Sequence, residues 1–153
     1  MKRILSLVLA VMTLAVAAAA QEKPDFTGTW KLAGDAPDQF TPSQIVVAKD
    51  ATVLTVTTTG QMGEFKTTYK LDGTPGPSPL DFQGQQIDRT TKATWDDKKL
   101  TLSATSDMNG QTIEIKSVVS AGPDGTMIVE TTFPDFQGGG APITTKASYK
   151  KAP

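Results

Sequence analysis

The sequence predicts an all-β protein, built as a single antiparallel up-and-down β-barrel of about eight to nine strands. Apolar and polar residues alternate with period two through most of the chain after residue 20, as is typical of half-buried strands. No segment there shows the sustained 3.6-residue repeat of an amphipathic helix. Short turn sequences separate the alternating segments, and Asn109-Gly110 favours a two-residue type I′ hairpin. Closing such a meander into a barrel removes its exposed edges.

Residues 1–20 have the pattern of a secretory signal peptide. A positively charged start precedes an apolar run over residues 4–16, and alanines up to Ala20 favour cleavage at that point. A transmembrane anchor is the alternative, but the run is short for a bilayer span and lacks a charged stop. We therefore expect one mature domain, residues 21–153, in the periplasm or outside the cell.

The composition excludes most enzymatic mechanisms. The chain contains no His and no Cys, so it has no Ser-His or Cys-His pair, no Cys/His zinc site and no disulfide. Two of the 15 basic residues belong to the signal, which leaves 13 against 16 acidic residues, without a basic run for nucleic acid. Asp81 and Asp135 offer few ligands for calcium. We expect no enzymatic activity, no cofactor and no metal, and a monomeric protein.

Nine alternating segments are expected to form the strands. Each has apolar, β-branched or aromatic residues at alternate positions and is bounded by turn residues. The segments are 27–33, 43–49, 52–59, 63–71, 86–95, 99–108, 111–120, 126–133 and 142–150.

The alternation assigns one face of each strand to the barrel interior. The other face carries mainly Lys, Glu, Asp and Thr, so a soluble barrel is expected rather than a membrane barrel. Near the 96–98 hairpin, the inner residues are large: Phe65, Trp95, Leu100, Val119, Met127 and Tyr149. At mid-height they are mostly small or hydroxylated: Thr67, Arg89, Thr91, Ala93, Ala104, Ser106, Ser117, Thr131, Thr145 and Ala147.

This arrangement predicts a small cavity above an aromatic floor that includes Trp95 and Tyr149, because such small side chains leave space inside a barrel. A ligand there would contact inner-facing polar residues, namely Tyr69, Arg89, Thr91, Ser106, Ser117 and Thr131. The alternative is a flattened barrel whose walls touch, with Thr and Ser present for their strand propensity.

Arg89 is the only charged residue of the inner set at mid-height. No Asp or Glu lies on the same face to pair with it, so a buried guanidinium would need a carboxylate, a sulfate or water. In a ligand-binding barrel, Arg89 would bind an acidic group. A bulge near Gln85-Gln86, or a side chain that reaches the rim, would instead turn it outward.

The tetrapeptide Asp-Phe-Gln-Gly occurs twice, at 81–84 and 135–138, within the longest predicted loops, 72–86 and 134–141. Phe82 and Phe136 would form an apolar lip at the mouth of the barrel or a surface for a protein partner. Alternatively, each Phe folds down as a plug. Two functions therefore remain: binding of a small ligand in the interior, or a protein-interaction module that uses these loops, such as an exported inhibitor or envelope accessory factor.

The sequence Gly28-Thr29-Trp30 resembles the Gly-x-Trp motif that opens the first strand of lipocalin-like proteins, the calycin superfamily. The chain also resembles small secreted bacterial proteins with a later Trp-Asp-x-x-x-Leu hairpin, here 95–100, and an ending near Tyr149-Lys150. The resemblance implies that Trp30 closes the floor of the barrel. It also implies binding of a small apolar or amphipathic molecule, without catalysis.

Overall fold

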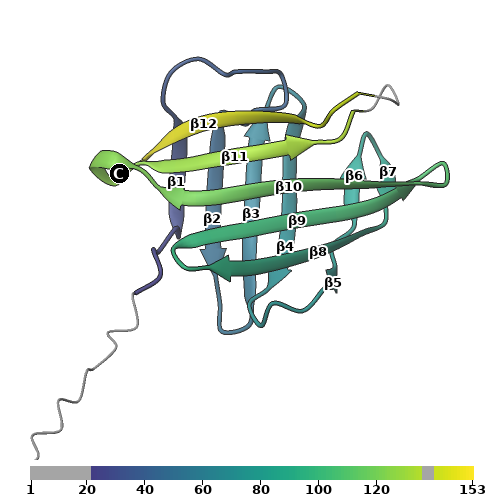
Figure 1. Ribbon diagram of the computed structural model, residues 1–153, viewed down its shortest axis with the longest axis horizontal. Coiled ribbons are helices and arrows are strands. Elements are labelled where there is room, and N and C mark those ends of the chain that lie inside the picture. The colour runs from purple at the N-terminus through teal and green to yellow at the C-terminus, as the bar shows by residue number, and fades with distance from the viewer. Residues whose placement is uncertain (1–21, 136–139) are drawn as a thin grey trace, which may run out of the picture.

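The computed structural model describes residues 22–135 and 140–153, and it confirms an all-β antiparallel architecture (Figure 1). The predicted signal segment lies outside these ranges. The strands are β1 (Gly28–Leu32), β2 (Gln44–Lys49), β3 (Val53–Gly60), β4 (Gly63–Lys70), β5 (Gly76–Pro77), β6 (Leu80–Phe82), β7 (Gln85–Ile87), β8 (Arg89–Asp96), β9 (Lys99–Met108), β10 (Gln111–Ala121), β11 (Met127–Phe133) and β12 (Ile143–Lys151). A short 3₁₀ turn, η1 (Pro123–Gly125), joins β10 to β11. Within the described ranges, no helix has the length and apolar character needed to cross a membrane.

Each of the nine predicted strands is confirmed, with its ends displaced by at most three residues. The predicted count of eight to nine strands is too low, because the 72–86 loop and the residue after it contain three further short strands. Gln83 and Gly84 adopt positive φ angles of 54° and 78° and form the turn between β6 and β7. Asp88 separates β7 from β8, so the predicted strand 86–95 is divided in two.

Ten strands form one sheet, in the order β4-β3-β2-β1-β12-β11-β10-β9-β8-β5, and β6 pairs with β7 in a separate hairpin. The central feature is β1, which pairs with β2 on one side and with β12 on the other. Figure 1 shows that β1 to β4 run across the direction of β8 to β12, so that the sheet curls round on itself. The result is a nearly closed up-and-down barrel.

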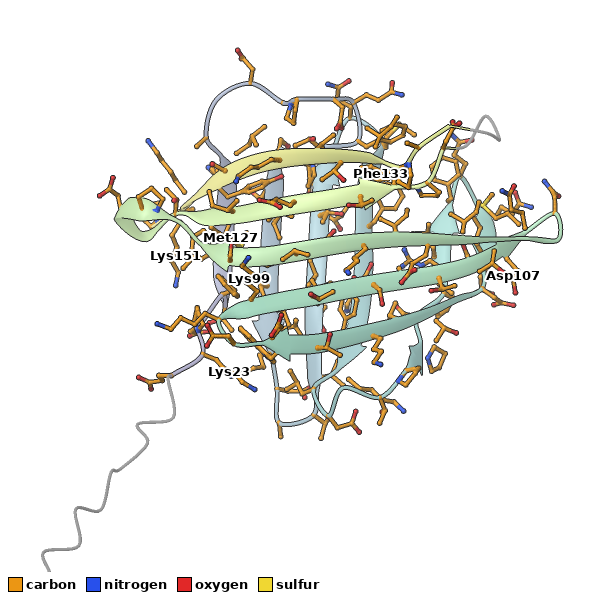
Figure 2. All side chains as sticks on the ribbon, viewed as in Figure 1. Lys23, Lys99, Asp107, Met127, Phe133 and Lys151 are labelled. Carbon is orange, nitrogen blue, oxygen red and sulfur yellow. The ribbon has the colours of Figure 1, made fainter. Side chains whose placement is uncertain are left out.

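The two ends of the barrel differ in the segments that cover them. We call the end with the β8–β9 turn the bottom and the end with the β9–β10 turn the top. Asn109 and Gly110 at the top have positive φ angles of 53° and 78°, which a type I′ hairpin requires, and this confirms the predicted turn. Lys99 and Lys151 lie at the bottom and Phe133 at the top (Figure 2).

The apolar core includes an aromatic group at the bottom of the barrel. Trp30 is buried, and its indole Nε1 donates a hydrogen bond to the carbonyl oxygen of Phe26 at 2.8 Å. The Phe26 ring in turn stacks on Trp95, with the ring centroids 6.1 Å apart. Lys23 lies over the Trp95 ring and Lys151 over the Trp30 ring. The N-terminal segment thus covers this end of the barrel.

Side chains, rather than a backbone ladder, close the barrel between β4 and β8. The Thr91 hydroxyl donates to the Thr68 carbonyl oxygen at 2.6 Å, and the Ser78 hydroxyl accepts from the Thr68 N–H at 3.0 Å. Arg89 Nε donates to the Ser78 carbonyl oxygen at 3.2 Å, and its Nη2 donates to Thr67 Oγ1 at 3.1 Å. We call these five residues the β4–β8 seam. No β4–β8 ladder occurs among the described strands.

Candidate functional site

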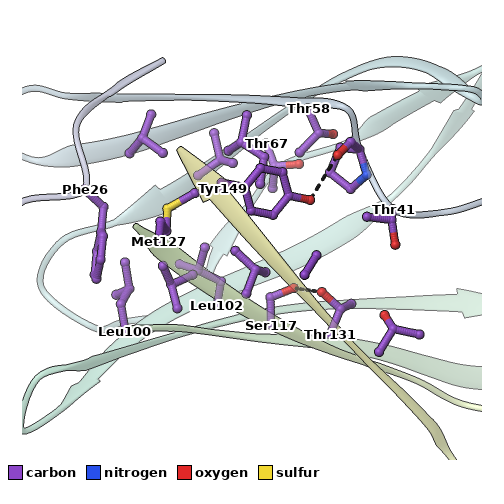
Figure 3. Close-up of a pocket in the computed structure, with 18 of the residues that line it drawn as sticks. Phe26, Thr41, Thr58, Thr67, Leu100, Leu102, Ser117, Met127, Thr131 and Tyr149 are labelled. Atoms are coloured by element: carbon purple, nitrogen blue, oxygen red, sulfur yellow. Dashed lines mark hydrogen bonds between the residues drawn. The ribbon is translucent and has the colours of Figure 1, made fainter. Parts of the chain in front are cut away.

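A cavity of about 190 Å³ lies inside the barrel (Figure 3). Residues from both crossing halves of the sheet and from the connection between β1 and β2 form its wall. The wall is made of Phe26, Phe40, Thr41, Pro42, Ile45, Val47, Leu54, Val56, Thr58, Thr67, Tyr69, Leu100, Leu102, Ser117, Val119, Met127, Val129, Thr131, Phe133, Thr145, Ala147 and Tyr149. None of these described wall residues carries a charge.

One end of the cavity is apolar. Figure 3 shows Phe26, Leu100 and Met127 together at this end, while Thr58 and Thr131 lie toward the other. Met127 is almost fully buried and Leu100 is buried, so this end is shielded from solvent. Binding of a ligand at this end is favoured because the apolar surface of the ligand is removed from water.

The other end of the cavity carries hydroxyl groups on two opposing walls. Ser117, Thr131 and Thr145 form a row across β10, β11 and β12, because each lies directly opposite the next in the strand pairing. The Ser117 and Thr131 hydroxyls hydrogen-bond to each other at 3.1 Å. Thr58 on β3 and Thr67 on β4 supply hydroxyls from the facing wall. The cavity is therefore amphipathic along its length.

Tyr69 provides a buried phenol at the cavity wall. Its side chain is on β4, and the residue is only 8 % exposed. Burial raises the pKa of Tyr69 to about 12, although the nearby Arg89 guanidinium opposes the rise. The phenol is therefore protonated at neutral pH. Among the described residues, its hydroxyl has no hydrogen-bonding partner, so it remains able to donate and to accept a hydrogen bond.

The connection between β1 and β2 covers the top of the cavity. Phe40 contacts Phe133 at a ring-centroid distance of 5.5 Å. The Tyr149 hydroxyl donates to the carbonyl oxygen of Pro42 at 3.0 Å, which fastens this connection to β12. Asp38 stabilises the same connection, since its Oδ1 accepts hydrogen bonds from the backbone N–H groups of Phe40 and Thr41, both at 2.7 Å.

Three of the predicted ligand contacts lie on the cavity wall: Tyr69, Ser117 and Thr131. Arg89 and Thr91 lie instead in the β4–β8 seam, where both side chains bond to β4 or to the segment before β8. The predicted need of Arg89 for a partner is thus met by the Ser78 carbonyl and the Thr67 hydroxyl.

Two further predicted contacts, Ser106 and Phe82, are not part of the described cavity wall. Ser106 is directly opposite Arg89 in the β8–β9 pairing. Phe82, on the β6–β7 hairpin, stacks on Phe65 of β4 with the ring centroids 6.1 Å apart. Phe136 lies outside the described residues. The Asp-Phe-Gln-Gly repeats therefore do not form a described pair at the mouth.

Of the three predicted floor residues, Trp30 and Trp95 lie in the aromatic group at the bottom of the barrel, and Tyr149 lies on the cavity wall. Trp30 is buried and Trp95 lies beneath Phe26, so Phe26 is the aromatic residue that contacts the cavity from below. Tyr149 lies between Met127 and the β1–β2 connection and forms a side wall (Figure 3).

Sequence reasoning missed the parts of the wall that regular strands do not supply. Phe26 precedes β1, and Phe40, Thr41 and Pro42 belong to the irregular β1–β2 connection. Side-chain direction cannot be read from alternation outside a strand. The one available signal was the Asp38-x-Phe40-Thr41 spacing, which suits an Asx turn and a fixed loop conformation.

No protein-family model matches this chain, and a search of curated proteins finds no similar sequence. The cavity and its chemistry are therefore the main indication of function.

Proposed function

We propose that this chain is an exported, soluble β-barrel of the lipocalin type, within the calycin superfamily, that binds a small apolar or amphipathic molecule in its interior. The observation that carries the proposal is the 190 Å³ cavity with an apolar end and a hydroxyl-bearing end. The nearly closed meander and the Gly28-Thr29-Trp30 opening support the assignment to this class of barrel. Export rests on the pattern of residues 1–20.

An empty cavity of this size is energetically unfavourable. Protein interiors are close-packed and contain few voids larger than a water molecule. On the scale measured for engineered cavities, about 24 cal/mol per Å³, an empty space of 190 Å³ corresponds to about 4–5 kcal/mol. Water can occupy the hydroxyl-bearing end, but the apolar end offers water few partners. An apolar or amphipathic occupant satisfies both ends.

The wall chemistry favours binding over catalysis. Its described polar groups are hydroxyls, and burial raises the pKa values of both tyrosines in the wall, Tyr69 and Tyr149. Thr41 donates its hydroxyl to Asp38 Oδ1 at 3.0 Å, but that oxygen also accepts two backbone N–H groups of the β1–β2 connection. The other wall hydroxyls bond to no carboxylate among the described residues, and a hydroxyl without a neighbouring general base is a poor nucleophile at neutral pH. The same groups can orient a ligand through hydrogen bonds.

The test is native mass spectrometry of the protein purified from cells that express the full chain, before and after extraction with organic solvent. A discrete adduct that extraction removes supports the proposal. Ser117→Phe, which places a ring in the cavity, should abolish the adduct. The matched control is Lys116→Phe, since Lys116 is exposed on the outer face of the same strand.

Two outcomes would contradict the proposal. The first is an adduct that survives in Ser117→Phe, because the ligand would then lie elsewhere. The second is a protein without adduct in which Ser117→Phe raises the free energy of unfolding while no added small molecule binds. The phenylalanine would then simply fill a void.

A further inference from the structure

The charge of the cavity wall limits the chemical class of its ligand. All described wall residues are uncharged, so an ionised group in the interior would lose its hydration without gaining a counter-charge. Arg89 borders the cavity at Thr67 and Tyr69: its Nη2 donates to Thr67 Oγ1, its Nε donates to the Ser78 carbonyl oxygen, and its charge opposes the rise that burial causes in the pKa of Tyr69. Its donors are thus directed at the seam.

Asp38 brings a negative charge close to the top of the cavity, since its carboxylate accepts the hydroxyl of the wall residue Thr41. Burial and, after it, the Asp38 carboxylate raise the pKa of Tyr149. The field of this carboxylate therefore reaches a wall residue. Its Oδ2 is buried and has no hydrogen-bonding partner in the described part of the chain. An anionic ligand near this end would be repelled, and the Arg89 guanidinium beside β4 already donates to the Thr67 hydroxyl and the Ser78 carbonyl oxygen.

Tyr69 supplies a polar anchor for an uncharged ligand. Buried phenol hydroxyls usually find a hydrogen-bonding partner. The Tyr69 hydroxyl has none among the described residues: more than nine-tenths of the residue is buried at the cavity wall, but the hydroxyl oxygen itself keeps some accessible surface. By contrast, the hydroxyl of Tyr149 donates to the Pro42 carbonyl oxygen, and the Ser117 and Thr131 hydroxyls pair with each other. One O–H of that pair and the Thr145 hydroxyl have no described acceptor.

The volume sets the size of the ligand. A dry cavity of about 150 Å³ accepts benzene. The present cavity, at about 190 Å³, holds one ring with a small substituent and is too small for a long acyl chain.

We propose that the cavity binds an uncharged, single-ring molecule whose one hydroxyl or carbonyl group hydrogen-bonds to Tyr69, while the ring occupies the apolar end near Met127. This inference deepens the proposed function and rests on it. The ligand proposed here is neutral. If the Arg89 side chain pointed into the cavity, an acidic ligand would be expected instead.

The test is a calorimetric titration at neutral pH with four ligands that share a methylbenzene ring: toluene, p-cresol, p-toluate and 4-methylbenzylammonium. We expect p-cresol to bind about three- to tenfold more tightly than toluene, which is the worth of one neutral hydrogen bond. The anion p-toluate should bind at least about a hundredfold more weakly than p-cresol, because it loses its hydration and is repelled by the Asp38 carboxylate. The cation 4-methylbenzylammonium should also bind more weakly than p-cresol, but by a smaller factor, because the Asp38 carboxylate offsets part of the lost hydration.

The Tyr69→Phe variant tests the anchor. It should remove the advantage of p-cresol over toluene and leave the affinity for toluene unchanged, so that toluene serves as the internal control for an intact cavity. An advantage that survives in Tyr69→Phe would show that another hydroxyl binds the ligand. If the variant does not fold, the four-ligand series in the unaltered protein still tests the neutral class.

The remaining outcomes separate this inference from the proposed function. Tighter binding of p-toluate or 4-methylbenzylammonium would overturn the neutral class and leave the binding function intact. If none of the four binds, the single-ring class is refuted, and the adduct experiment decides independently whether the interior has any ligand.

Discussion

Replacement of Thr91 by Val should weaken the barrel at its β4–β8 seam. Thr91 is 1 % exposed, and its hydroxyl donates to the carbonyl oxygens of Thr68 at 2.6 Å and Gly76 at 3.2 Å. Val has nearly the same shape and a higher strand propensity, so the substitution removes little more than the hydroxyl. The Thr68 carbonyl oxygen would remain buried without its donor, which costs about 1–3 kcal/mol. We expect a loss of about 2 kcal/mol.

The measurement is urea denaturation of Thr91→Val beside its neighbour Thr90→Val. Thr90 is on the same strand, is exposed and makes no side-chain hydrogen bond to a described residue, so the control carries the same chemical change outside the seam. A loss of about 2 kcal/mol should lower Tm by roughly 6–10 °C for a domain of this size. Equal stabilities of the two variants, within about 0.5 kcal/mol, would refute the idea that side chains close the barrel.

Two further predictions concern the tyrosines and the top hairpin. Because burial raises the pKa of Tyr69 from 10.0 to about 12, the folded state retains a proton that the unfolded state releases. The contribution of the Tyr69 phenol to the free energy of unfolding is therefore complete below pH 10 and is lost as the pH rises to 12. Between pH 9 and pH 11, the free energy of unfolding of the unaltered protein should therefore fall by about 1.4 kcal/mol more than that of Tyr69→Phe, as measured by urea denaturation at both pH values. Equal losses in the two proteins would contradict this pKa. Gly110→Ala should cost about 1 kcal/mol through its φ of 78° alone, since an added Cβ meets no described atom within 4 Å, whereas the neighbouring Gln111→Ala should be neutral in the same assay.

Strand positions and inner faces could be predicted because alternation is a geometric property of the strand itself. Tyr69, Ser117, Thr131 and Tyr149 were assigned to the interior in this way, and all four lie on the cavity wall. The hairpin at Asn109 could be predicted for a similar local reason. In each case the neighbours in sequence contain the relevant information.

Arg89 and Thr91 show where that information ends. The same alternation placed them on the inner face, but their roles depend on which strand lies beside β8. That neighbour is β4, together with Ser78 from a connection that was predicted to be a loop. Where two neighbouring strands lack backbone hydrogen bonds to each other, as β4 and β8 do, side chains bond to the unpaired backbone groups. The place where this gap falls depends on how the whole barrel closes, so it cannot be read from the local sequence.

The seam and the cavity are linked through β4. Thr67, Thr68 and Tyr69 are consecutive, and the first two have polar groups paired across the seam: Thr67 with Arg89, and the backbone of Thr68 with Ser78 and Thr91. Seam closure therefore engages the Thr67 hydroxyl, which lies on the cavity wall, whereas Tyr69 keeps its hydroxyl without a described partner. A Thr91→Val barrel that loosens at the seam should accordingly lose selectivity for p-cresol over toluene as well as stability, because a shift of β4 would displace the Tyr69 hydroxyl from the position in which it meets the ligand.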